Sequence, residues 1–302
     1  MYDVIIIGAG AAGITAAIYA ARANLKFEII SKDVGGLTLW SSDIENYTGY
    51  HNLNGITLIE KFKEHMADYN IKVKEDTVKK VEKKDNKFLV KTEKDEFETK
   101  TVIVCSGSSP RKLNVPGADK YEGKGLAYCA TCDGPLFAGR DVAIVGGGDA
   151  ALDAGNTLLN MGINKIYILN INPELTGTDK ALMEKVTKSE KVEVINNAST
   201  KEITGDDFVK GIKYEQEGEE KTLDVQGVFV EIGHVRNVDF IKDLVKINEK
   251  NEIIVDKEMA TSVKGIFAAG DVNDIPGKQT IIGAGDGAKA LLSAFRYISK
   301  RG

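Results

Sequence analysis

The chain of 302 residues has few of the side chains from which several classes of protein are built. It contains three cysteines, five prolines, three histidines and one tryptophan. Three cysteines are too few for a disulfide scaffold, and at least one of them must stay unpaired. Its 40 basic and 45 acidic residues give a net charge of −5, which leaves no basic excess for binding nucleic acid.

Long hydrophobic runs are also missing. No apolar run approaches the roughly 20 residues that cross a bilayer, and the opening residues "MYDVIIIGAGAAG" lack the basic region of a secretory signal. We therefore expect a cytoplasmic protein without a membrane partner. In that compartment a disulfide is more often catalytic than structural.

Glycine, by contrast, is plentiful, and two glycine-rich turns begin two similar halves of the chain. Residues 2–30 run from an apolar strand through "GAGAAG" into an Ala-rich helix and a second strand; residues 140–169 repeat this order through "GGGDAA". Polar strands and a returning apolar strand, "TVIVCSG" or "GVFVEIG", follow each unit. The pattern predicts an α/β protein with two Rossmann-like nucleotide-binding domains, each of three layers (ββα).

A third apolar run, "GIFAAGD" at 265–271, has no glycine loop of its own. Its simplest place is as the last strand of the first domain. The second domain is then an insertion: residues 1–112 and 237–302 form the first domain, and residues 113–236 form the second. Polar stretches at 114–119 and 234–239 are the predicted hinges.

The two glycine loops predict different abilities to bind a nucleotide. Gly8, Gly10 and Gly13 follow a strand and open a helix, which is the context of a dinucleotide fingerprint. The second loop, from Gly146 through Gly148 to Ala151, has the same context. The strand after it ends at Asn170, where an NAD site has an acid and an NADP site has arginine.

Cys129 and Cys132 form the Cys-x-x-Cys sequence "CATC". This spacing occurs in half of a zinc site and in redox disulfides, but the sequence contains no second pair and no His-x-x-x-His. A dithiol–disulfide couple at a helix start fits better, with Asp133 able to donate or accept a thiol proton. Cys105, within an apolar run, is predicted to be a buried core residue.

Ordered motifs along nearly the whole chain resemble the low-molecular-weight thioredoxin reductases. These motifs are "GAGAAG", "YAARANL", "GG" with "IENYTG", "CATCDG", "GGGDAA", "IGH", "FAAGDV" and "KQT…GAGDG". The resemblance implies FAD in the first domain, a nicotinamide-type second domain carrying the cysteines, and a homodimer built through the FAD domains. It also implies that Cys132 faces the flavin, that Cys129 attacks the disulfide of a thioredoxin-like partner, and that Asp133 is the acid/base.

The resemblance assigns two sets of binding residues. The FAD contacts are expected at Gly8, Gly10, Ala11, Ala12, Gly13, Ser31, Gly36, Leu37, Asn46, Gly107, Asp271, Lys278, Gln279 and Thr280. A possible nicotinamide nucleotide is expected at Gly146, Gly148, Asp149, Ala150 and Ala151.

The chain departs from this family at the residues that select NADPH. The family's His-Arg-Arg and following Arg align with Asn170, Ile171, Asn172 and Thr176, none of which is basic. Leu37 also stands where most members have Gln. Related proteins with such losses take electrons from ferredoxin or another flavin-like donor. We therefore expect poor use of NADPH, while NADH remains possible.

Three functions are consistent with these patterns. The first is an FAD-dependent thioredoxin-disulfide reductase with a donor other than efficiently bound NADPH. The second is an NADH- or NADPH-dependent reductase of thioredoxin, another small redoxin or a peroxidase partner. The third, from a different class, is a flavoprotein that senses redox state through the Cys129–Cys132 pair.

Overall fold

The computed structural model describes residues 1–41, 44, 46–51 and 53–300. It separates into two compact units. The first consists of Met1–Ser109 with Val235–Gly302, and the second is Pro110–His234. The second unit is therefore inserted into the sequence of the first.

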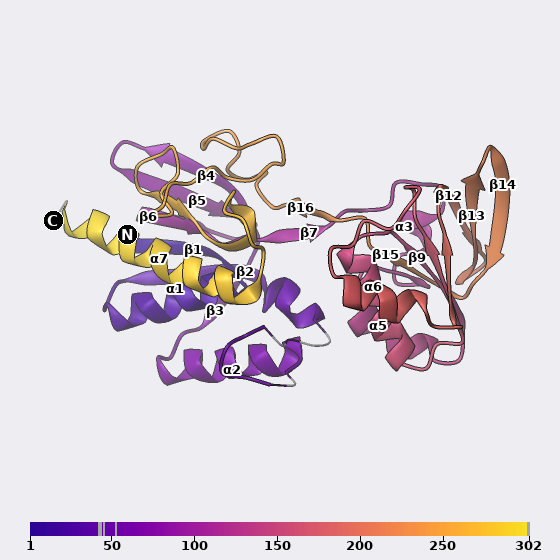
Figure 1. The fold of residues 1–302 in the computed structure, drawn as a ribbon. Helices are drawn as coiled ribbons and strands as arrows, with labels where there is room; N and C mark the ends of the chain where they lie inside the picture. Colours follow the sequence, from indigo (N-terminus) through magenta and orange to yellow (C-terminus); the bar gives the residue numbers. More distant parts are fainter. Residues whose placement is uncertain (42–43, 45, 52, 301–302) are drawn as a thin grey trace. The chain divides into compact units, whose positions relative to one another are not determined.

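The first unit is built on a seven-stranded sheet (Figure 1). Along its main path the strand order is β3-β2-β1-β6-β5-β4, and β17 pairs with β6. β1 runs parallel to β2 and β6, whereas β4, β5 and β6 form an antiparallel meander. The strands are β1 (Tyr2–Ala9), β2 (Phe27–Val34), β3 (Val73–Glu75), β4 (Val78–Lys84), β5 (Lys87–Thr92), β6 (Glu96–Val104) and β17 (Ile266–Ala268).

β17 is the strand predicted from "GIFAAGD". It lies parallel to β6, with Ile266 opposite Val102 and Ala268 opposite Val104. The sheet that begins at the N-terminus is thus completed by residues more than 250 positions further along the chain. This pairing explains why the third apolar run needs no glycine loop of its own.

Helices cover one face of this sheet, and the meander with its neighbouring loops covers the other. Side chains of β1 alternate between two cores, because Val4 and Ile6 pack toward the helices and Ile5 and Ile7 toward the opposite layer. Figure 1 shows α1 and α7 running side by side. The helical segments are α1 (Ala11–Arg22), η1 (Gly36–Trp40), α2 (Gly55–Asp68), η3 (Gly270–Val272) and α7 (Thr280–Ser299).

The second unit repeats this architecture. Its parallel five-stranded sheet has the order β11-β10-β9-β15-β8, and β12, β13 and β14 form a separate antiparallel sheet. The strands are β8 (Leu126–Ala127), β9 (Asp141–Val145), β10 (Lys165–Leu169), β11 (Val192–Ile195), β12 (Ala198–Gly205), β13 (Val209–Gln216), β14 (Glu219–Asp224) and β15 (Gly227–Val230). The helical segments are α3 (Ala118–Tyr121), α4 (Ala130–Asp133), η2 (Gly134–Phe137), α5 (Asp149–Asn160) and α6 (Lys180–Thr187).

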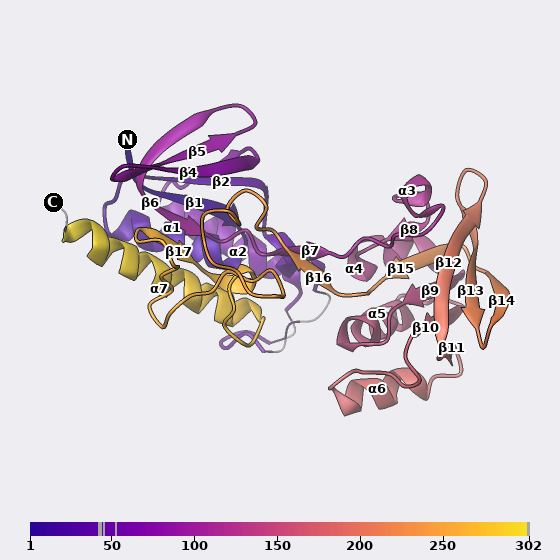
Figure 2. The ribbon, with the colours of Figure 1, turned by 90° about the horizontal axis from the view of Figure 1, so that it is seen from above.

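Figure 2 shows α5 and α6 on one side of this parallel sheet and β12–β14 on the other. Phe229 and Leu152 belong to the core on the helical side, and Val228 and Ile212 to the core beneath the antiparallel sheet. The protein is therefore an α/β protein with two Rossmann-like folds, as the repeated sequence pattern predicts.

The chain passes between the units in two short strands, β7 (Ser108–Pro110) and β16 (His234–Arg236), which pair with each other. The predicted hinge at 114–119 begins a few residues beyond this crossing. That segment belongs to the second unit, where Ala118 is 2% exposed and the N–H of Ile203 donates to Pro116 O. The segment is polar overall, but its two apolar residues Val115 and Ala118 pack in the core of the second unit.

Candidate active site

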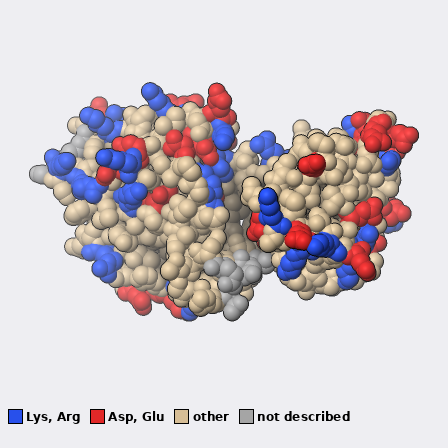
Figure 3. Space-filling view, viewed as in Figure 1, with Lys and Arg blue, Asp and Glu red and all other residues tan. Residues whose placement is uncertain are grey.

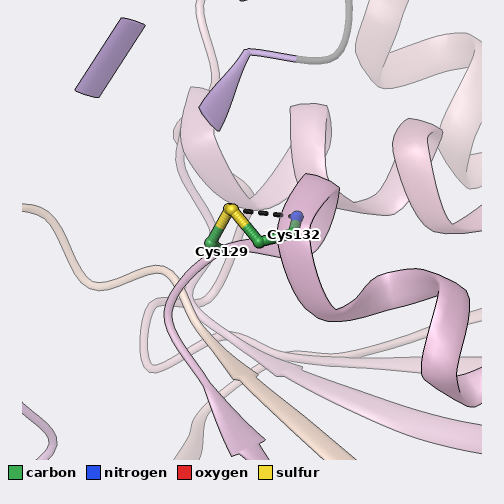
Figure 4. Close-up of a disulfide and its surroundings, with 2 residues drawn as sticks. All are labelled: Cys129 and Cys132. Carbon is green, nitrogen blue, oxygen red and sulfur yellow. Dashed lines mark hydrogen bonds between the residues drawn. A yellow bond between two sulfur atoms is a disulfide. The ribbon is translucent and has the colours of Figure 1, made fainter. Parts of the chain in front are cut away.

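The cysteine pair lies at the carboxyl edge of the second unit's parallel sheet. Cys129 follows β8 and is the N-cap residue of α4, while Cys132 lies within that helix (Figure 4). The two sulfurs are joined in a disulfide, with 5.3 Å between the Cα atoms. The expectation of a closable pair at a helix start is confirmed. Cys105 is the free, buried thiol, and burial raises its pKa.

The two sulfurs have different surroundings. Cys129 is 7% exposed, whereas Cys132 is open to solvent within its unit. The backbone N–H of Cys132 donates to Cys129 Sγ at 3.1 Å, a contact that stabilises negative charge on Cys129 when the disulfide opens (Figure 4). The structure thus distinguishes an accessible sulfur at Cys132 from a sheltered, hydrogen-bonded sulfur at Cys129.

Asp133 is the carboxyl group next to the pair. It is partly buried, and this burial raises its pKa from the ordinary value for aspartate. A raised pKa brings the carboxyl closer to the pH at which it can both give and accept a proton. This is the property expected of the acid/base.

The first glycine loop joins β1 to α1 without room for side chains. A Cβ at Gly8 would lie 2.2 Å from Cys105 O, and one at Gly13 would lie 1.8 Å from Gly8 O. A Cβ at Gly10, the N-cap residue of α1, would have Gly35 O as its nearest neighbour, at 3.9 Å. Gly8 and Gly13 therefore hold strand and helix together, whereas Gly10 leaves open space at the helix start.

Segments that carry other predicted FAD contacts converge on this helix start. A Cβ at Gly36 would lie 3.6 Å from Gly10 Cα, and one at Gly270, next to Asp271, would lie 3.1 Å from Ala12 Cβ. A Cβ at Gly287 of α7 would lie 2.0 Å from Ala12 O. Three motifs far apart in sequence thus meet at the N-terminus of α1.

Two hydrogen bonds connect the neighbouring loops to the start of α7. Asn46 Nδ2 donates to Gln279 Oε1 at 3.0 Å, and the hydroxyls of Thr38 and Thr280 are 3.2 Å apart. Thr38 is not among the predicted FAD contacts. Its position two residues after Gly36 is the feature of the sequence that could have indicated it. Glu45, within the motif "IENYTG", lies outside the described residues.

The remaining predicted residues are less closely grouped. Ser31 lies in β2, Leu37 in η1, and Gly107 just beyond β6 with a φ of 60°. Lys278 makes an ion pair with Glu252 at 3.6 Å and donates to Asn273 O. Its ammonium group is therefore held by this chain's own residues.

The first loop suits the pyrophosphate of a dinucleotide. Among the described residues no side chain caps α1, and its first turn contains no acidic residue, so its first N–H groups are left for a ligand beside Gly10. A helix start of this kind stabilises bound phosphate through its N–H donors and dipole. The donor set and the space fit FAD.

The second glycine loop differs at the same position. Gly146 has a φ of 142° beside Glu231 O, Gly148 is the N-cap of α5, and Ala150 and Ala151 lie in its first turn. That turn also contains Asp149. Its carboxylate accepts from Thr178 N at 2.6 Å, Thr178 Oγ1 at 2.8 Å and Asp179 N at 3.3 Å. The segment after β10 is thereby fastened to the helix start.

The residues aligned with the family's His-Arg-Arg and following Arg are neutral, and two of them, Asn170 and Thr176, are held in place. Asn170 is fully buried; its amide donates to Asn172 O and Asn196 Oδ1 and accepts from Asn172 N. Thr176 N donates to Gly147 O at 2.7 Å, while Ile171 is 69% exposed. None of these groups offers a cation to a 2′-phosphate.

Charges of both signs are interspersed on the face shown in Figure 3. Within the described part of the chain, no helix is long and apolar enough to cross a membrane, and no group of three or more His, Cys, Asp or Glu side chains has an arrangement that could hold a metal ion.

Glu231 is a second residue that sequence reasoning missed. It lies in "GVFVEIG", directly after β15. Burial, and then the charge of Asp153, raise its pKa to about 8. A carboxylate directly after a buried parallel strand was the available signal, because such strand ends line the ligand-binding edge of α/β sheets.

Comparison with known proteins places this geometry in a family. The model for the pyridine nucleotide-disulphide oxidoreductases matches residues 2–288. A Bacillus subtilis protein named NADH dehydrogenase is 42% identical over 300 residues, which are 98% of this chain and 58% of that protein. An alkyl hydroperoxide reductase protein of Staphylococcus epidermidis is 40% identical over 305 residues, 98% of this chain and 59% of that protein. The chain thus spans about three fifths of the length of these relatives.

Solved structures match over the full chain. Lactococcus lactis thioredoxin reductase is 32% identical, with a TM-score of 0.93 and coverage of 99% of this chain and 100% of that one. A ferredoxin-flavin thioredoxin reductase from Clostridium acetobutylicum is 34% identical, with a TM-score of 0.56 and coverage of 99% and 98%. With its redox disulfide and thioredoxin reductase fold, the chain belongs to the pyridine nucleotide-disulphide oxidoreductase family of flavoproteins.

Proposed function

We propose that this protein is an FAD-dependent thioredoxin-disulfide reductase, in which electrons pass through the flavin to Cys129–Cys132 and on to a thioredoxin-like protein. The observation that carries the proposal is the disulfide at the start of α4, with one accessible sulfur and one stabilised sulfur. Asp133 adds a carboxyl of raised pKa beside it. A structural disulfide needs neither feature.

The first unit binds the cofactor in this account. Gly10 and the first turn of α1 hold the pyrophosphate of FAD. The other expected contacts are Asn46, Asp271 of η3, Gln279 and Thr280 at the start of α7. When bound, FAD supplies an electron pair from a donor to the disulfide. The homodimer stays a prediction from the family resemblance.

The cysteines then transfer the electron pair to the partner by thiol–disulfide exchange. The Cys129 thiolate attacks one sulfur of the partner's disulfide, and the partner's other sulfur leaves with the electron pair and takes a proton. Cys132 next attacks Cys129 in the mixed disulfide. This step restores Cys129–Cys132 and releases the partner as a dithiol, and Asp133 exchanges the protons.

The donor in this proposal is one other than efficiently bound NADPH. Asn170, Ile171, Asn172 and Thr176 provide no cation, and hydrogen bonds to a charged group are worth about 1.5–3 kcal/mol each. Losing two of them weakens binding of NADPH by about 3–6 kcal/mol, a hundredfold or more. The ferredoxin named for the Clostridium acetobutylicum structure indicates one class of low-potential donor.

A second candidate is an NADH-dependent reductase of another small redoxin or a peroxidase. The names of the two relatives, NADH dehydrogenase and alkyl hydroperoxide reductase, favour it. The absence of an acid at Asn170 argues against tight NADH binding. A redox sensor, which reacts once and stops, is the candidate from another class.

Steady-state reduction of a thioredoxin disulfide tests the proposal. The holoenzyme is given NADPH, NADH, reduced ferredoxin or a reduced deazaflavin under anaerobic conditions, and bleaching near 450 nm and partner thiols are followed together. We expect repeated turnover with a low-potential donor and slow bleaching by NADPH. Rapid turnover only with NADH and a peroxidase partner favours the second candidate. A single turnover with every donor indicates a sensor.

A further inference from the structure

Glu231 lies on the strand next to the one that leads into the cysteine pair. β8 and β15 are parallel neighbours, with Val228 opposite Leu126 and Phe229 opposite Ala127. Continuing this register by two residues places Glu231 opposite Cys129. The backbone of Glu231 still follows the strand, because its N–H donates to Val145 O of β9 at 2.7 Å.

Glu231 and Cys129 also share a face of the sheet. Phe229 and Ala127 pack in the core on the α5 side, whereas Val228 and Leu126 pack on the opposite side. Side chains alternate along a strand, so Glu231 and Cys129 both project toward the layer that contains α4 and α5. The carboxyl is thus directed to the same edge as the redox sulfur.

The surroundings favour the protonated form of this carboxyl. Glu231 is partly buried, and neither a cation nor a hydrogen-bond donor is among the causes of its pKa shift. Burial, and then the negative charge of Asp153 on α5, raise its pKa to about 8. Near neutral pH it carries a proton that Cys129 lacks once the disulfide opens.

We propose that Glu231 is a second proton-exchange group of the redox pair and serves Cys129. A thiolate attacks the accessible sulfur of Cys132 and forms a mixed disulfide with it; the Cys129–Cys132 bond breaks, and its electron pair goes to Cys129 Sγ. The Glu231 carboxyl gives that sulfur its proton and regains one from solvent. In the reverse direction it takes the proton when Cys129 attacks the partner's disulfide.

This inference rests on the proposed function of the cysteine pair, but its test needs neither thioredoxin nor an electron donor for the flavin. Oxidised holoenzyme is mixed anaerobically with dithiothreitol at pH 6.0–9.5, quenched in acid, and its new thiols are counted by mass spectrometry. The rate constant is expressed per dithiothreitol thiolate, which removes the titration of the reagent itself.

The wild-type rate constant is expected to fall as pH rises through about 8, when Glu231 loses its proton. Glu231→Gln keeps the shape of the side chain but has no proton to give. Its rate constant should be about tenfold or more below wild type at pH 6.5 and should not fall near pH 8. Glu231→Asp should recover part of the rate.

Other titratable groups lie around this edge and are separated by further variants. They are Asp153 and Asp149 of α5, Asp133 of α4, and Tyr128 and His234 near the ends of β8 and β15. Asp153→Asn removes a negative charge that raises the pKa of Glu231, so the decrease of the rate constant with pH should occur at lower pH. Glu220→Gln, on exposed β14 of the same unit, should leave the profile unchanged.

A Glu231→Gln protein that keeps its flavin and its wild-type profile overturns the inference. If thioredoxin is not reduced while the dithiothreitol profile behaves as expected, the proposed function fails and the role of Glu231 stands. If thioredoxin turns over while the profile is insensitive to Glu231, the inference fails alone. Circular dichroism and flavin content identify any variant that has not folded.

Discussion

The backbone N–H of Thr176 donates to Gly147 O at 2.7 Å, which joins the segment after β10 to the second glycine loop. Asp149 strengthens the junction through Thr178. A nicotinamide nucleotide would bind at this same helix start. The chain thus holds the segment after β10 against this helix start, and Asn170, Ile171, Asn172 and Thr176 offer no cation to a nucleotide there.

The first prediction is that arginines at exposed positions improve the use of NADPH. Ile171→Arg with Asn172→Arg leaves the buried Asn170 and the bound Thr176 intact. Each new contact to the 2′-phosphate is worth about 1.5–3 kcal/mol. The NADPH concentration that gives half the maximal rate of flavin bleaching should therefore fall at least tenfold. The constant for NADH, which lacks that phosphate, should stay the same. An equal gain for both nucleotides would show that the arginines act elsewhere.

The second prediction separates folding from cofactor binding in the first glycine loop. Gly10→Ala has space for its methyl group in the protein, but that methyl enters the volume assigned to the pyrophosphate. We expect a folded protein that loses most of its FAD absorbance. Gly13→Ala meets Gly8 O at 1.8 Å, so it should lower the unfolding temperature itself. A fully yellow Gly10→Ala protein would place the pyrophosphate elsewhere.

The third prediction concerns the pH dependence of stability. Below about pH 4.5 Glu231 is protonated in both the folded and the unfolded state and has no effect. Between that pH and about 8 only the unfolded state ionises, so the folded protein loses stability as pH rises. The side chain keeps some contact with water, which reduces the effect of the pKa shift on stability. We therefore expect Glu231→Gln to raise the free energy of unfolding by about 2 kcal/mol at pH 8.5 and to change it little at pH 4.5.

Urea unfolding of the wild-type and Glu231→Gln proteins at pH 4.5 and at pH 8.5 measures the difference in their free energies of unfolding. Glu220→Gln serves as the control, because its side chain is exposed. A gain of equal size at both pH values would mean that the substitution improves packing rather than removing a charge.

The sequence predicts the fold well wherever strand and turn residues act locally. The continuous Val and Ile runs of β1 and β9, with glycine directly after them, allow little besides buried parallel strands that turn into helices. The segment at 114–119, predicted as a hinge, could not be placed within the second unit in this way. Its anchors, Val115 and Ala118, are small apolar residues whose partners lie on β12 and beyond.

The candidate site was predictable in part for the same reason. Cys129, Cys132 and Asp133 are neighbours in sequence, and their spacing alone indicates their chemistry. Glu231 is placed beside Cys129 only by extending the register of β15 on β8, two strands about a hundred residues apart in the sequence. The burial of Asn170 likewise depends on Asn196, which follows another strand.

The most direct test of the central claim is a single transfer of electrons from reduced holoenzyme to thioredoxin. The flavin is photoreduced anaerobically, mixed rapidly with oxidised thioredoxin, and followed near 450 nm while thioredoxin thiols are counted. In wild type we predict flavin reoxidation with one thioredoxin dithiol formed per electron pair. In Cys129→Ser with Cys132→Ser the flavin should remain bound and reduced. Reduction of thioredoxin by this double variant at the wild-type rate would show that electrons leave by another route.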